Sequence, residues 1–147
     1  KLLGWTHSPN AVATYDNSNN SFSLFTAAVW GLPEVVNGKV YQTVNLQPGT
    51  YLLKIDVAGA DGPVDIYAIV AGGTLPDYTN AESSASVMRY ADLIPNQGKT
   101  IEIPFAVTTA GAVNIGVVYN IRSQYESKGV PWSSFNINGF QLSRVVL

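Results

Sequence analysis

Hydrophobic and polar residues alternate along most of this chain, most clearly over residues 39–57. Two alternating runs flank Gln47-Pro48-Gly49-Thr50, and apolar residues share one face of each: Val40, Val44 and Leu46 in the first, then Tyr51, Leu53, Ile55 and Val57. Period-two alternation of β-branched and aromatic residues indicates strands. Pro48 fixes φ and Gly49 accepts positive φ, so we expect a type II turn that joins the two strands as a β-hairpin.

Gln42 is the polar exception in this pattern, because it falls on the same face as Val40 and Val44. A glutamine at such a position must find hydrogen-bond partners. We therefore expect either a buried amide with its partners or a residue near the edge of a sheet.

Similar runs predict further strands, at about residues 10–15, 22–28, 64–71, 101–107, 113–121 and 135–147. Residues 64–71 are apolar on both faces except at Asp65, which indicates a central strand covered on two sides. Pro104 cannot donate to a ladder, so the strand over 101–107 is expected at an edge or at a bulge.

The residue pattern of the last predicted strand indicates a β-bulge. Phe135 and Ile137 share one face, whereas Phe140 and Leu142 have the opposite parity. All four reach one core only if the register slips by one residue at Asn138-Gly139, as a β-bulge allows.

Residues 81–94 are ambiguous. Val87, Tyr90, Ala91 and Ile94 recur at the spacing of one helical face. The serines at 83, 84 and 86 instead favour caps and turns. The sequence alone does not decide whether a short helix forms here.

These elements predict an all-β fold, an antiparallel β-sandwich of jelly-roll type with about eight strands and at most one short helix. The 147 residues form one expected domain, 1–147. The chain begins at Lys1 rather than Met, which suggests a piece of a larger protein with other domains.

Composition narrows the function classes. Charged residues make up 12% and hydrophobic residues 46%, and the net charge is −2, so nothing favours nucleic acid as a partner. No stretch approaches the roughly 20 apolar residues of a membrane span, and no signal peptide is visible. Cysteine is absent, which excludes disulfides and thiolate metal sites.

Catalytic chemistry has little support. His7 stands alone, and no motif spacing supplies it with partners. Glycoside hydrolysis needs two carboxylates across a cleft, and nothing selects a pair among the ten acidic residues. We therefore expect a protein that is not an enzyme.

Aromatic residues in or beside predicted loops are the stronger signal. They are Trp30, Tyr78, Tyr125 and Trp132, and polar side chains such as Asp77 and Arg122 lie next to them in sequence. Aromatic faces stack on sugar rings while polar groups pair with hydroxyls, so these six residues are the candidate ligand-binding set. The alternative is that the rings cap the ends of the core, which we favour for Trp30.

The order of the pieces resembles a galactose-binding-like jelly roll, the fold of many carbohydrate-binding modules. The resemblance rests on VYQTVNLQPGTYLLKIDV (40–57), VNIGVVYN (113–120) and INGFQLSRV (137–145). More narrowly, GGTLPDYTN and FNINGFQLSRV resemble C-terminal domains of Bacteroidetes surface lipoproteins encoded near glycan-utilisation machinery, many of unknown function. This resemblance implies an extracytoplasmic location, at the cell surface or in the periplasm.

The resemblance also bears on calcium. Many modules of this fold hold a structural calcium through an acidic residue in the final strand, where this chain has Asn138. A neutral amide is a poorer ligand for a hard dication than a carboxylate, so no cofactor is expected, although backbone carbonyls elsewhere could still supply a structural calcium site.

Three hypotheses follow. The first is a non-catalytic carbohydrate-binding module of a cell-surface protein, which holds glycan through loop aromatics and polar side chains. The second is a structural or protein-interaction sandwich without a glycan site. The third is a hydrolase with two facing carboxylates.

Overall fold

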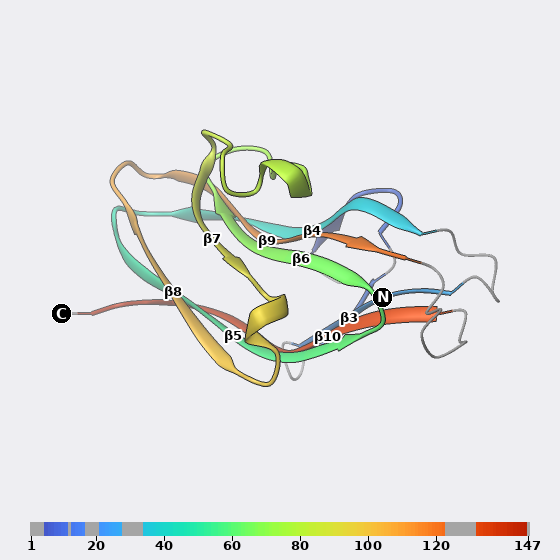
Figure 1. Ribbon diagram of the computed structural model, residues 1–147. Coiled ribbons are helices and arrows are strands. Elements are labelled where there is room, and N and C mark those ends of the chain that lie inside the picture. Colours follow the sequence, from blue (N-terminus) through green and yellow to red (C-terminus); the bar gives the residue numbers. More distant parts are fainter. Residues whose placement is uncertain (1–4, 12, 17–20, 28–33, 123–131, 147) are drawn as a thin grey trace.

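Two antiparallel five-stranded sheets pack face to face in this chain (Figure 1). The structure, a computed structural model, describes residues 5–11, 13–16, 21–27, 34–122 and 132–146. One sheet has the order β1-β4-β9-β6-β7 and the other β2-β3-β10-β5-β8. The strands are β1 (Thr6–His7), β2 (Ala13–Asp16), β3 (Ser21–Ala27), β4 (Val35–Leu46), β5 (Gly49–Asp61), β6 (Val64–Ala71), β7 (Val87–Asp92), β8 (Thr100–Val107), β9 (Gly111–Ile121) and β10 (Trp132–Arg144). The predicted all-β sandwich is confirmed.

The inward faces of the strands are those that the alternation predicted. Leu53, Ile55 and Val57 of β5 are at most 1% exposed and meet Val40 and other residues of the opposite sheet in one core. Burial of this apolar surface is the main favourable term in folding.

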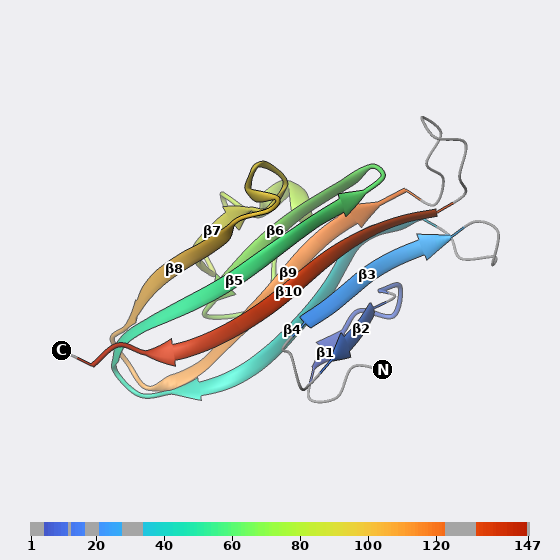
Figure 2. The ribbon, with the colours of Figure 1, turned by 90° about the horizontal axis from the view of Figure 1, so that it is seen from below.

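The predicted hairpin at 39–57 is wrong, although both strands exist. β4 and β5 lie in different sheets, so the short link between them crosses the sandwich (Figure 2). Gly49 does not have the positive φ that a type II turn requires. Instead the Tyr51 hydroxyl donates to the Gln47 carbonyl at 2.7 Å, and Arg144 Nη2 donates to the Pro48 carbonyl at 2.9 Å. Alternation defines the faces of a strand, but it does not say which sheet the strand joins.

The short helix that the sequence allowed for residues 81–94 does not form. Residues 87–92 are β7, paired with β6, and the described residues around it hold only the 3-10 helices η2 (Tyr78–Asn80) and η3 (Ile94–Asn96). β7 pairs with β6 and is the last strand of its sheet. This tertiary pairing outweighs the helix preference that the spacing of Val87, Tyr90 and Ala91 suggested.

Three other predictions are confirmed. β8 is an edge strand, as Pro104 required. The register of β10 against β5 shifts between Asn136 and Gly139, and Phe135, Ile137 and Phe140 are all buried. β6 is buried on both faces.

The second face of β6 is covered by the segment 74–86, which lies over the outer side of its sheet (Figure 1). Leu75 and Ala81 of this segment pack on Tyr67, Ile69 and Val118 in a second small core. A polar contact holds the residue that precedes the segment, since Asn114 Nδ2 donates to the Gly73 carbonyl at 2.7 Å. The outer face of the sheet is thus closed under this segment.

Candidate functional site

The candidate residues predicted from sequence divide into two groups. Trp30 and Tyr125 lie outside the described residues, and Trp132 is described only as the first backbone position of β10. Tyr78, Asp77 and Arg122 are fully described. The site is therefore built from these three and from the residues that they meet.

Arg122 lies at a hollow of about 460 Å³ where β4 and β6 begin and β9 ends. We call it the end hollow. Its base is formed by Val35, Val64 and Ile121, each at most 7% exposed. Around that base stand exposed or half-buried groups of several kinds, namely Glu34, Val36, Pro63, Asp65, Asn120 and Arg122. Two carboxylates, an amide and a guanidinium thus converge on one hollow.

Asn37 joins this hollow to Tyr78. It has a φ of 55°, a left-handed conformation that asparagine tolerates better than most residues, and the pairing of β4 with β9 is irregular there. Its backbone N–H donates to Asn120 Oδ1 at 2.8 Å, while its own Oδ1 accepts from the backbone N–H of Tyr78 at 2.8 Å. One irregular residue of β4 therefore positions both Asn120 and Tyr78.

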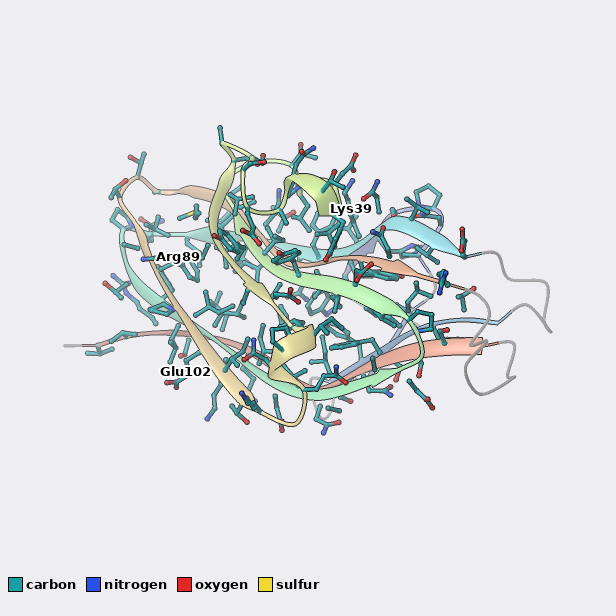
Figure 3. All side chains as sticks on the ribbon, in the orientation of Figure 1. Lys39, Arg89 and Glu102 are labelled. Atoms are coloured by element: carbon teal, nitrogen blue, oxygen red, sulfur yellow. The ribbon has the colours of Figure 1, made fainter. Side chains whose placement is uncertain are left out.

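Asp77 is tied to β4 as well. Lys39 Nζ lies 2.7 Å from Asp77 Oδ1, and Figure 3 shows Lys39 rising from its strand toward the segment 74–86. The carboxylate is exposed, so this pair contributes little stability. Its effect is to fix where η2 lies on the sheet.

Tyr78 is half-buried against another tyrosine. Its ring centroid is 5.2 Å from that of Tyr67, and the Tyr67 hydroxyl donates to Glu82. Burial raises the pKa of the Tyr78 hydroxyl, and the carboxylates of Asp65, Asp92 and Glu82 raise it further. The phenol therefore stays protonated and available as a hydrogen-bond donor through neutral and moderately alkaline pH.

This arrangement suits a neutral polar ligand. An aromatic ring offers a face for stacking, and the amides, carboxylates and guanidinium offer both donors and acceptors. No cluster of three or more histidine or acidic side chains that could hold a metal ion occurs in the described residues.

The sequence prediction selected Arg122, Asp77 and Tyr78, which the fold brings to one region. It missed Asn37, Asp65 and Asn120, which complete that region. Asp65 and Asn120 are paired across β6 and β9 and interrupt apolar runs on both strands. That interruption was the available signal.

The sequence of this chain matches a family described as "Domain of unknown function (DUF5013)" over residues 4–116. The chain belongs to this family. Among curated proteins, none matches its sequence. DUF5013 is thus the relationship that the sequence establishes.

Several solved structures similar to this DUF5013 chain are carbohydrate-binding modules. TmCBM61, solved in complex with β-1,4-galactotriose, has a TM-score of 0.57 at 20% identity over 96% of this chain and 88% of its own. A CBM4 structure has 0.54 at 12% identity over 97% and 95%. The CBM22-2 xylan-binding domain of Paenibacillus barcinonensis Xyn10C has 0.50 at 15% identity over 99% and 94%. At these identities the likeness shows a common β-sandwich fold.

No helix in the described part of the chain is long and apolar enough to cross a membrane.

Proposed function

We propose that this chain is a non-catalytic carbohydrate-binding module of a cell-surface or periplasmic protein. The observation that carries the proposal is the end hollow together with Tyr78, whose backbone N–H is bound by Asn37 and whose hydroxyl is subject to the charge of Asp65, a residue of the hollow. The common fold with carbohydrate-binding modules supports it. The resemblance to Bacteroidetes surface lipoproteins supports the location, and the parent protein would supply other domains.

The six candidate residues stay part of this proposal. Tyr78 would stack on a sugar ring, and Arg122 would donate to hydroxyls from the wall of the hollow. Asp77 would position η2 through Lys39. Trp132, Tyr125 and Trp30 stay in the proposal as the sequence predicts them.

Affinity gel electrophoresis tests the proposal with soluble polysaccharides, among them β-1,4-galactan and xylan. We expect at least one to retard the chain. Tyr78→Ala and Arg122→Ala should each weaken that retardation about fivefold to tenfold. Tyr90→Ala is the matched control, because it also removes a ring beside Tyr67, whereas only Tyr78 is linked through Asn37 to Asn120 of the end hollow.

Two outcomes would contradict the proposal. If no polysaccharide retards the chain, the protein-interaction alternative stands, and the exposed Met88 and Tyr90 on β7 would be its first candidate surface. Glu34 and Asp65 both line the end hollow. Release of reducing ends from a bound polysaccharide would therefore contradict the non-catalytic assignment.

A further inference from the structure

β7 has a neighbouring strand on one side only. It is the last strand of its sheet, and β8 is the last strand of the other sheet on the same flank (Figure 1). Among the described residues, none pairs with the free side of β7. The free edge of a strand presents main-chain N–H and C=O groups that can pair with another chain.

Tyr90 carries main-chain groups that point to this free edge. In an antiparallel ladder, pairs that exchange hydrogen bonds alternate with pairs that do not. Leu93 N–H donates to the Ile66 carbonyl at 3.0 Å. In this alternation Ala91 also bonds to β6, whereas Tyr90 does not. The N–H and C=O of Tyr90 therefore face away from β6.

A hollow lies on each side of β7 at this point. The inner hollow, of about 330 Å³ between β7 and β8, has Arg89, Ala91, Ile101 and Ile103 among its lining residues. The outer hollow, of about 360 Å³, is lined by Glu82, Val87, Met88, Arg89 and Tyr90. Successive side chains of a strand point to opposite faces, so a strand added beside Tyr90 would direct its side chains to the two hollows in turn.

The inner hollow has a cation beside apolar walls. Arg89 lies opposite Val70 of the main core, so its side chain leaves β7 on the face that looks toward the other sheet. It forms no salt bridge or side-chain hydrogen bond with any described residue. Glu102 also lines this hollow, but it is on the outward face of β8, opposite Lys54 of β5. The guanidinium of Arg89 is therefore the charge that a ligand between the strands would meet.

The outer hollow is more apolar in character. Met88 is 37% exposed and Tyr90 is 46% exposed, and both belong to its lining. The carboxylate of Glu82 in the same lining already accepts a hydrogen bond from the Tyr67 hydroxyl. A thioether and a phenol ring at the surface favour an apolar side chain here.

We propose that β7 binds an extended segment of a partner protein as an added strand, with acidic side chains directed at Arg89 and apolar ones at Met88 and Tyr90. Main-chain bonds to Tyr90 would supply affinity, and the two hollows would supply specificity. A strand with apolar residues on both faces would bury the Arg89 guanidinium without a partner, and a basic strand would repel it. Arg89 thus opposes pairing between two copies of this chain and selects an acidic partner. None of these β7 residues lines the end hollow, so the proposal does not depend on glycan binding.

Titration of the full chain with synthetic peptides tests the choice of partner, with fluorescence anisotropy as the measurement. The probe is an end-capped, labelled peptide of alternating glutamate and valine, and the comparison peptides have lysine or threonine in place of glutamate. We expect the glutamate peptide to bind about fivefold more tightly than either. Arg89→Gln should remove this preference, and Arg89→Glu should reverse it in favour of lysine. Lys99→Glu is the matched control, because it adds the same charge change at an exposed lysine that lines neither hollow.

Hydrogen exchange tests the added strand itself. The Tyr90 amide should exchange more slowly when the glutamate peptide is bound, because its N–H then donates to the peptide. The proposal is overturned if no peptide binds at about millimolar concentration, where even weak sites are occupied. Equal affinity for the three peptides, or binding that leaves exchange at Tyr90 unchanged, also overturns it. Dimers of the unmodified chain that protect the Tyr90 amide would assign this edge to a second copy instead.

Discussion

At the scale of single residues, Tyr67 joins the sheet to the segment that covers it. It is 9% exposed, its ring lies against Tyr78, and its hydroxyl donates to Glu82. The hydrogen bond to Glu82 is the main cause that raises the pKa of Tyr67, and burial adds to it. The folded chain therefore holds this proton at pH values where the unfolded chain has released it.

The stability that comes from Tyr67 should accordingly be complete below about pH 10 and decline as the pH rises above that value. We expect Tyr67→Phe to cost about 1 kcal/mol at neutral pH, through the lost hydrogen bond. Above about pH 10 its stability should fall less steeply than that of the unmodified chain. Urea unfolding at a series of pH values measures both effects. Parallel decline of the two proteins would show that Tyr67 does not carry the pKa difference.

At the scale of elements, the two edge strands on one flank are protected in different ways. Figure 3 shows Arg89 on β7 and Glu102 on β8, at the free edges of the two sheets. Arg89 lies opposite the buried Val70 and lines a hollow between the sheets with Ile101 and Ile103. A charge on the core-facing side of an edge strand opposes pairing with another strand. β8 has Pro104 instead, which offers no N–H.

Arg89→Val should therefore promote association through β7. We expect its sedimentation coefficient to rise with concentration more than that of the unmodified chain. Glu102→Val is the control, because Glu102 faces outward and Pro104 remains in its strand. Equal association of both variants would mean that added surface hydrophobicity, rather than the freed edge, causes it.

At the scale of the whole molecule, the core is shared by both sheets and completed late in the sequence. β10 lies between β3 and β5, and its Phe135 and Ile137 belong to the main core. The DUF5013 match ends at residue 116, inside β9 and before β10. A chain that stops there would leave β3 and β5 without the strand that joins them.

A fragment of residues 4–116 should consequently fail to fold, whereas 1–147 should unfold in one cooperative transition. Circular dichroism and thermal unfolding of the two chains measure this. A fragment with a cooperative transition would show that β10 is dispensable and that the domain boundary proposed at 147 is too late.

Part of the candidate site could be read from sequence for a simple reason. The residue types of Tyr78, Asp77 and Arg122 indicate ligand binding by themselves, and all three lie in or beside predicted loops. Asn37 could not be found in this way, because its role depends on an irregular β4 conformation that brings it to Asn120 and Tyr78 at once. Gln42 was marked in sequence as a polar residue at a core-facing position, and the structure places it half-buried on β4.

By itself, the sequence determined most of the strands and their buried faces, because alternation is a local property of each strand. It also indicated the bulge in β10 through a change of parity, and through Pro104 it limited β8 to an edge or a bulge. Only the tertiary structure decided that β4 and β5 join different sheets and that residues 87–92 form a strand. Those outcomes depend on which strands, distant in sequence, pair with each other, and local alternation does not specify that pairing. The end hollow likewise depends on residues from several strands that meet only in the fold.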